Sequence, residues 1–314
     1  MTGIIKNIKW RKTILPAGAT VSSTILKIGY YGKGDPKVAL VAGVHGDEGP
    51  WGAWAVQKLL KRTKADQLKG SLKIVPQANP LAMEVDSRVA PVDHLDLNRV
   101  FPGDENGSYT ERLACFISRE VLDDADLVID LHGGGSWCVN AFAFKFKGSD
   151  KFAKAFDPPF LLDAPKREGT ITGYAYEKGS NVVAVEMGGK CHMENVWAEY
   201  ISEGIERCLK HIGVINGGLI DFKCKSVQVG PSKVLRPSLG GMFIPGVDAS
   251  KVGTIVEKGT ILGRIVDPAS MEVREVFKAP FKSTAILLLR PMITVLNGGE
   301  MTYVVSSPLN SGDS

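Results

Sequence analysis

Four side chains that can bind a metal ion or transfer a proton lie at the ends of apolar segments that are far apart in the sequence. His45 and Glu48 follow one such segment, His132 ends a second, and Glu186 ends a third. Two imidazoles and one carboxylate form a ligand set of catalytic zinc, with a fourth position left for water. Zinc lowers the pKa of that water, and a nearby carboxylate can accept its proton. The residue types therefore predict zinc-dependent hydrolysis, with one zinc ion per chain bound by His45, Glu48 and His132, and with Glu186 as the base.

The spacing around His45 predicts a turn between a strand and a helix. The segment 38–44 is continuously apolar, as expected of a strand that is buried on both faces of a parallel sheet. Pro50 suits the first turn of a helix, and apolar residues then recur at helical spacing as far as Leu60. A histidine and a glutamate so close on one turn can reach the same ion, whereas the third ligand of a zinc site usually comes from far along the chain.

The apolar segments and the patterns between them predict the fold. Segments 125–132 and 181–187 repeat the pattern of an apolar strand that ends in a polar residue and a glycine turn, and helical patterns lie between the strands. We expect an α/β fold with a mixed, mostly parallel sheet and helices on both faces, whose ligands bind beyond the carboxyl ends of the strands. After about residue 220 short strand-like pieces are divided by glycine and proline, which predicts a small all-β part. We therefore predict a catalytic domain over 1–220 and a β domain over 221–314.

A long irregular segment, residues 77–107, carries two arginines that can serve a substrate. Loops of this length are uncommon inside a compact domain and are usually functional. The guanidinium groups of Arg88 and Arg99 can hold a carboxylate through two parallel hydrogen bonds or stabilise the oxyanion of a tetrahedral intermediate. Two arginines near a zinc ion would allow one to do each task. Asp130 precedes His132 by two positions, so it points to the same side of the strand and can orient that imidazole.

Each of these features also has an ordinary interpretation. A His-x-x-Glu pair is a weak signal, a histidine before glycines can simply end a tight turn, and a carboxylate or an arginine can be a solvated surface group. The joint occurrence of the features favours a site. Cys138, Cys191 and His192 are further candidate ligands, but the first set already fills a catalytic site. No Gly-Lys-Ser/Thr or Gly-x-Ser-x-Gly pattern is present, so we set aside a phosphate loop and a serine nucleophile.

Composition restricts the partners and the compartment. The net charge is +4 for 314 residues and no basic block is present, so nucleic acid is not an expected partner. No apolar run approaches the roughly 20 residues of a membrane helix, and the amino terminus lacks a signal-peptide core. The 5 cysteines are scattered, which favours reduced thiols. We expect a cytoplasmic protein that binds a small molecule and not a membrane. Its oligomeric state stays open, a homo-oligomer included.

The motifs together resemble the succinylglutamate desuccinylase/aspartoacylase family, which belongs to the zinc carboxypeptidase-like hydrolases. The matching residues keep the same order over residues 38–190 and are Gly43-Val-His45-Gly-Asp-Glu48, Asn79-Pro80, Arg88, Asp96-Leu-Asn98-Arg99-Val-Phe-Pro-Gly103, Asp130-Leu-His132 and Val185-Glu186. The resemblance implies the same zinc ligands and the same base, which also shuttles the proton. It further implies that Arg88 lies near the scissile carbonyl and that Asn98 and Arg99 bind a substrate carboxylate.

The resemblance also extends the predictions for the β domain and the activity. Family members carry a small carboxy-terminal β domain, and the segments 257–263 and 278–281 look like a barrel-sandwich, lipoyl-like hairpin, without a lysine in a context for lipoyl or biotin attachment. If this domain docks beside the carboxyl edge of the sheet, the crevice becomes a closed pocket. We expect a zinc-dependent deacylase that hydrolyses the amide of a small N-acyl amino acid or a related metabolite. A zinc carboxypeptidase that acts on peptides and a non-catalytic binding or carrier protein are the alternatives.

Overall fold

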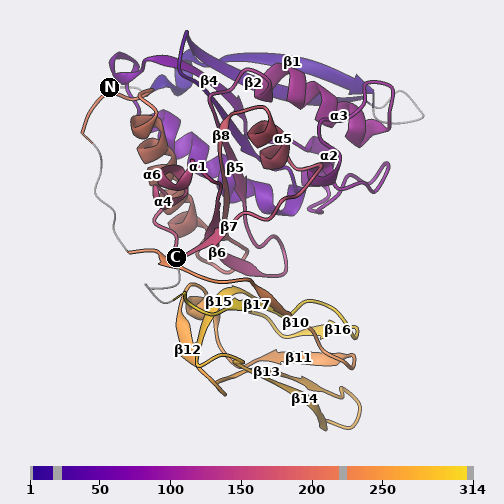
Figure 1. Cartoon of the computed structure of the whole chain (residues 1–314). Coiled ribbons are helices and arrows are strands. Elements are labelled where there is room, and N and C mark those ends of the chain that lie inside the picture. Colours follow the sequence, from indigo (N-terminus) through magenta and orange to yellow (C-terminus); the bar gives the residue numbers. More distant parts are fainter. Residues whose placement is uncertain (1–2, 17–22, 219–224, 310–314) are drawn as a thin grey trace.

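The computed structural model describes residues 3–16, 23–218 and 225–309. An α/β part comes first in the chain, and a β-rich carboxy-terminal part lies beside it (Figure 1). The predicted boundary between residues 220 and 221 lies outside the described residues, so the division into two domains stays a prediction. No helix of the described residues is long and apolar enough to cross a membrane.

Within the described residues, 13 strands form one large sheet with the main order β1-β2-β4-β3-β5-β8-β6-β15-β17-β10. Its first strands are β1 (Lys9–Pro16), β2 (Ser23–Lys33), β3 (Lys37–Ala42), β4 (Gly70–Val75), β5 (Leu127–His132), β6 (Val139–Lys145), β7 (Phe160–Asp163) and β8 (Asn181–Gly188). The central strands β4, β3, β5 and β8 pair in parallel, and β2 and β6 flank them in antiparallel. The predicted mixed sheet with a parallel centre is confirmed.

Helices cover both faces of this sheet, as predicted (Figure 1). They are α1 (Gly49–Arg62), α2 (Pro80–Glu84), α3 (Tyr109–Ile117), α4 (Asp150–Lys154), α5 (Ile171–Glu177) and α6 (Glu194–His211), with short helical turns η1 (Ile4–Asn7), η2 (Gly46–Glu48), η3 (Ala65–Gln67), η4 (Leu97–Arg99), η5 (Ser118–Leu122) and η6 (Ala249–Lys251). Alternate residues of β3 point to opposite faces, so Leu40 packs in the cluster under α1 and α6, while Val41 packs in the cluster under α3 and α5. This is why the segment is apolar at every position.

The carboxy-terminal part is all-β, as predicted, and it continues the large sheet. Its strands are β9 (Val227–Gln228), β10 (Lys233–Leu235), β11 (Gly241–Pro245), β12 (Ile255–Glu257), β13 (Ile261–Val266), β14 (Val273–Lys278), β15 (Ser283–Leu289), β16 (Thr294–Leu296) and β17 (Tyr303–Ser306). Strands β14-β13-β11-β16 form a separate antiparallel sheet, whereas β15 pairs with β6 through Leu288 opposite Asn140. This pairing fixes the carboxy-terminal part to the α/β part. Closure of its strands into a barrel stays a prediction.

Candidate active site

The fold brings the four predicted residues to one place at the carboxyl ends of the central strands. His45 and Glu48 lie on the turn between β3 and α1, and α1 begins at Gly49 with proline in its first turn, as predicted. His132 is the last residue of β5, and the register of β5 with β8 places Glu186 opposite it. The convergence follows from the parallel order of the strands, because parallel strands end at the same edge of a sheet.

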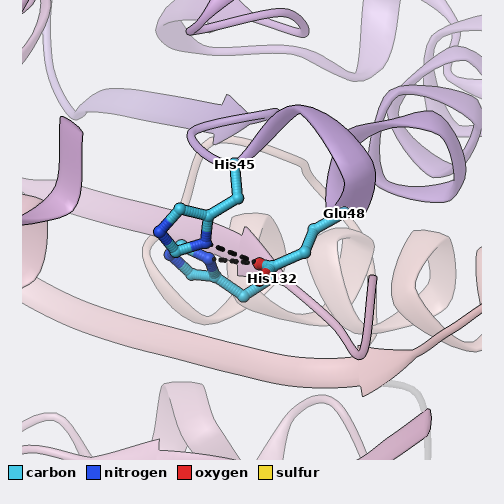
Figure 2. Close-up of side chains that lie close together, drawn as sticks. All are labelled: His45, Glu48 and His132. Atoms are coloured by element: carbon cyan, nitrogen blue, oxygen red, sulfur yellow. Dashed lines mark hydrogen bonds and ion pairs between the residues drawn. The ribbon is translucent and has the colours of Figure 1, made fainter. Parts of the chain in front are cut away.

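His45, Glu48 and His132 point toward one another in the protein interior (Figure 2). Oε2 of Glu48 lies 2.9 Å from Nδ1 of His45 and 2.8 Å from Nδ1 of His132. One potential ligand atom from each residue lies within 4.8 Å of the others. Two nitrogens and an oxygen at these distances can surround a single ion.

Each histidine also contacts a second carboxylate through its other nitrogen. Nε2 of His45 lies 3.1 Å from Oδ1 of Asp96, and Nε2 of His132 lies 2.9 Å from Oδ2 of Asp130. When Nε2 carries the proton and donates it to the carboxylate, Nδ1 keeps its lone pair for an ion. The orienting contact of Asp130 was predicted from the strand period. The contact of Asp96 was not predicted, although this residue is part of the recognised motif.

The ionisable groups of the cluster shift the pKa values of one another. Burial alone would raise the pKa of Glu48, but the nearby His45 and His132 outweigh it and hold this pKa well below its usual range. Burial alone would lower the pKa of His132, but Asp130 and Glu48 outweigh it and raise this pKa well above its usual range. The donors therefore require positive charge between them, which either protons or a metal ion can supply.

The donor set fits a bound divalent cation. Glu48, Asp96 and Asp130 surround the two imidazoles, and Asp47 is buried beside them. Oδ1 of Asp130 and Oδ1 of Asp47 have no hydrogen-bond partner among the described residues, so two buried carboxylate oxygens of the cluster lack a donor. Two histidines and one carboxylate match the ligand set of zinc hydrolases that keep one position open.

Close packing of α1 against the strand ends explains two of the glycines near the site. A Cβ atom at Gly133 or at Gly188 would lie 2.7 Å from Nε1 of Trp51, which is closer than real Cβ contacts. The indole ring of this α1 residue thus fits only because Gly133, directly after β5, and Gly188 of β8 carry no side chain. The glycines that follow the polar residues in the sequence therefore serve helix packing here.

Arg88 lies inside the charged cluster. Its Nε and Nη2 donate to Oδ2 of Asp96 at 3.1 and 2.9 Å, and its Nη1 donates to Oε1 of Glu48 at 3.3 Å. The side chain is still 45% exposed, and it lines a cavity that lies beside the cluster. This geometry places a fixed guanidinium beside the potential metal ligands, and its predicted contact with the scissile carbonyl stays a prediction.

Asn98 and Arg99 also line this cavity, but their polar atoms have partners of their own. Oδ1 of Asn98 accepts a hydrogen bond of 2.9 Å from the backbone nitrogen of Ile171, where α5 begins, and Nδ2 lies 3.3 Å from Nε2 of His132. Nη1 of Arg99 donates to the backbone oxygen of Asn98 at 2.6 Å. The remaining guanidinium nitrogens of Arg99 have no hydrogen bond to a described residue. Binding of a substrate carboxylate by Asn98 and Arg99 stays a prediction.

Glu186 faces the cavity with its carboxylate held by an amide. Its Oε2 accepts a hydrogen bond of 2.8 Å from Nδ2 of Asn140 on β6, a contact that no sequence pattern predicts. Burial, the largest influence, raises the pKa of Glu186 to about 6, and the neighbouring Glu48 acts in the same direction. A carboxylate with a raised pKa can both take up and release a proton near neutral pH.

The cavity beside the cluster has walls from both parts of the chain. It measures ≈ 270 Å³, and its lining includes Arg167 and Trp137 of the α/β part and Leu288 and Val304 of the carboxy-terminal part. The expected docking of the carboxy-terminal part beside the strand ends is thus observed. A larger cavity of ≈ 680 Å³ lies on the other side of Arg167 and is lined by none of the cluster residues.

The remaining candidate ligands are not part of the group that can hold an ion, although Cys138 lines the same cavity. The thiol of Cys138 donates to the backbone oxygen of Gly134 at 2.8 Å, and burial raises its pKa well above the usual range, so it stays protonated. Cys191 and His192 use their backbone nitrogens to contact Glu194 at the start of α6. Among the described residues, the group that can hold an ion contains only His45, Glu48 and His132.

The family model of the succinylglutamate desuccinylase/aspartoacylase catalytic domain matches residues 34–212. The N-alpha-acetyl-L-2,4-diaminobutyric acid deacetylase of Halomonas elongata is 35% identical over 198 residues, which span 59% of this chain and 57% of that protein, less than two thirds of its length. A succinylglutamate desuccinylase from Silicibacter sp. TM1040 superposes with a TM-score of 0.83 and 25% identity over 98% of this chain and 96% of that one. The product-bound ectoine utilization protein EutE from Ruegeria pomeroyi superposes with a TM-score of 0.81 and 25% identity over 95% of this chain and 94% of that one.

Proposed function

The chain belongs to the succinylglutamate desuccinylase/aspartoacylase family, and from this premise we propose that it is a zinc-dependent deacylase. The substrate is a small N-acylated amino acid or a related metabolite, and the reaction hydrolyses its amide bond. The observation that carries the proposal is the convergence of His45, Glu48 and His132 around one point, with Glu186 in register beside them. The Halomonas relative is an N-alpha-acetyl-L-2,4-diaminobutyric acid deacetylase, which supports the same reaction type.

The ligands and the base have separate tasks in this mechanism. His45 and His132 offer Nδ1, and Glu48 offers a carboxylate oxygen, to a zinc ion that would acidify a water molecule and polarise the amide carbonyl. Glu186 takes a proton from the attacking water and passes it to the leaving nitrogen. The carbon–nitrogen bond then breaks, so the products are a carboxylate and an amine. Asn140 holds the Glu186 carboxylate in place through both proton transfers.

Arginine side chains supply the positive charge that the substrate and the transition state need. Asp96 fixes the guanidinium of Arg88 beside the ligands, so it can stabilise negative charge on the carbonyl oxygen without reorganisation. Arg99 lines the same cavity and forms no ion pair within the described part of the chain, so it is available for the carboxylate of an amino acid.

The shape of the cavity favours a deacylase over a carboxypeptidase. The carboxy-terminal part covers one side of the cavity, whereas a carboxypeptidase needs a groove that is open to a long chain. Cover on one side also excludes part of the water and strengthens the electrostatic interactions within the site. A non-catalytic carrier would have no need for a buried ligand set beside a carboxylate whose pKa is raised to about 6.

The test compares substrates on the zinc-loaded full chain. We expect hydrolysis of N-acetyl or N-succinyl amino acids and little release of amino acids from peptides of ten residues, with one zinc ion per chain by metal analysis. The variant E186Q, which lacks the proposed base, should lose this hydrolysis. The variant E272Q is its control, since Glu272 is an exposed residue of the carboxy-terminal part. Efficient trimming of the peptides would overturn the deacylase proposal, and a protein that binds no zinc and hydrolyses neither class would support the carrier alternative.

A further inference from the structure

The cavity beside the metal cluster has two chemically different sides. The side formed by the ends of β3, β5 and β8 carries His45, Glu48 and Glu186. The neighbouring side is apolar and begins at β6, where Phe142 pairs with Glu186 of β8. It comes from β6, β7, β15 and β17, and its residues include Phe142, Phe144, Leu162, Leu287, Leu288 and Val304. If the substrate had only charged and polar groups, these apolar residues would contact either those groups or water. Such contacts lack the favourable burial that apolar surface provides.

The apolar side continues away from the metal cluster. A second cavity of ≈ 440 Å³ shares Phe144, Leu162, Arg167 and Ser232 with the first one. Its far end is formed by Val229, Pro231 and Leu309, which are also apolar. The two cavities meet at these shared residues, and we call the second cavity and the apolar side of the first the apolar groove, from Leu288 to Leu309. Together they fall within the volume of about 300–1,000 Å³ that is usual for small-molecule sites, whereas the first cavity alone lies just below it.

One wall of the groove is fixed by a stacking contact between the two parts of the chain. The guanidinium carbon of Arg290 lies 4.3 Å from the centre of the Trp137 ring, and Nε of Arg290 donates to the backbone oxygen of Met301 at 2.8 Å. Trp137 and Met301 both line the cavity. Arg290 therefore holds the indole ring of Trp137 and the backbone of Met301 in one wall, so that wall is preorganised before a substrate binds.

Two arginines lie where the groove meets the metal cluster. Arg167 borders both cavities, and Arg99 borders the first. Their segments touch, since the backbone nitrogen of Phe101 donates to the oxygen of Gly169 at 3.0 Å. Neither arginine forms an ion pair with another residue that the structure describes. If these arginines bind the α-carboxylate of an amino acid, its α-carbon lies at the entrance of the groove. The side chain on the α-carbon would then enter the groove.

We propose that the preferred substrates are N-acyl amino acids with an apolar side chain of several carbons, which occupies the apolar groove. This inference rests on the proposed deacylase function and adds the substrate class. Its closing experiment separates the two claims, because an N-acetyl amino acid without a side chain tests the function alone. N-acetylglycine is that substrate.

The first experiment measures kcat/KM of the zinc-loaded full chain on the N-acetyl derivatives of glycine, alanine, 2-aminobutyrate and norvaline. Burial of one methylene corresponds to about a fourfold gain, so we expect a rise on the order of 50-fold from glycine to norvaline. N-Acetylaspartate is the polar comparison and should fall below the alanine derivative. In a parallel series of N-acylglycines with longer acyl chains, kcat/KM should stay the same.

A second measurement uses binding instead of turnover. In the E186Q variant, which keeps the zinc ligands, the Kd of N-acetylnorvaline should be tighter than that of N-acetylglycine by a similar factor. V304T replaces an apolar group in the groove by an isosteric polar one and should lower the norvaline-to-glycine ratio at least threefold. V295T is the matched control, because Val295 on β16 is 73% exposed and lines neither cavity. It should leave the ratio unchanged.

Several results would overturn the inference. One such result is that kcat/KM does not change with the length of the side chain. Another is that N-acetylaspartate is preferred while N-acetylglycine is hydrolysed. In both cases the groove does not bind the side chain, and the deacylase proposal stands. If the rise follows the acyl series instead, the groove binds the acyl group and the assignment to the amino acid is wrong. If no N-acyl amino acid is hydrolysed or bound, the proposed function itself fails.

Discussion

The charged side of the cavity, at the ends of β3, β5 and β8, and its apolar side, from β6, β7, β15 and β17, are held in place by different forces. On the first side ionisable groups contact one another directly, as in the 2.8 Å contact of Glu48 with His132. On the second side aliphatic groups are positioned by backbone pairing, as where Leu288 of β15 lies opposite Asn140 of β6. The same strand β6 thus supports both sides, since Asn140 also binds Glu186.

This difference determines how each side responds to substitution. Removing one member of a buried charged cluster leaves its partners without compensation, and the cost is several kcal/mol, typically about 3–5. Removing one aliphatic group from a cavity wall that is partly open to solvent changes only the burial of a ligand, at about 0.8 kcal/mol per methylene. We therefore expect large effects on chemistry from the first side and smaller effects on substrate choice from the second.

The largest effect should come from H132A. His132 would contribute one of three protein ligands. Removal of a residue that only orients a ligand lowers metal affinity roughly 10- to 100-fold, and loss of a ligand itself should lower zinc affinity by more than that. Activity should fall with metal content. The measurement is zinc per chain after dialysis, with H211A as control because His211 ends α6 away from the cluster. Full, tight zinc occupancy in H132A would refute the ligand assignment.

E186Q should keep the metal and lose turnover. Glutamine has nearly the same shape but cannot accept the proton of water, and loss of a general base typically costs about 10²- to 10⁴-fold. The expected result is a fall in kcat on N-acetyl amino acids with an unchanged zinc content, compared with E272Q. Turnover close to that of the unmodified protein would show that another group is the base.

Sequence alone could predict the first side because its signals are local. The spacing of His45 and Glu48 on one turn and the polar ends of three apolar strands are visible without any tertiary contact, and the parallel order of the strands then brings them together. Asp130 followed from the two-residue period of β5. The contact of Asp96 with His45 joins residues 51 positions apart through an irregular loop, so no periodicity could reveal it.

The second side could not be predicted because apolar strand residues carry no distinctive motif. Val304 and Leu288 lie in short β segments that only indicate a sheet, and their place beside the metal cluster depends on the pairing of β15 with β6. The same holds for Trp137 and Arg290, which meet across 4.3 Å although they belong to different parts of the chain. Long-range pairing decides these contacts.

R99K tests the border between the two sides. The substitution keeps the charge but replaces a planar fork by a single ammonium group, so one of two hydrogen bonds to a carboxylate is lost. A hydrogen bond to a charged group contributes about 1.5–3 kcal/mol, so kcat/KM should fall about tenfold or more. R264K is the control, because Arg264 is exposed on β13. Unchanged efficiency, or equal activity on N-acyl amines that lack the carboxylate, would exclude this role.

The smallest effect should come from R290Q, which alters the second side without touching the first. Arg290 stacks on Trp137 and binds the backbone oxygen of Met301, and glutamine would remove the cation from the ring. A cation–π contact at a partly exposed site contributes about 0.5–1 kcal/mol, so KM for N-acetylnorvaline should rise about two- to fivefold. The value for kcat should change little, because the zinc ligands and Glu186 keep their contacts. R264Q is the matched control. If R290Q instead lowers kcat equally for glycine and norvaline substrates and leaves KM unchanged, Arg290 acts on the chemical side of the cavity, and the separation of the two sides is wrong.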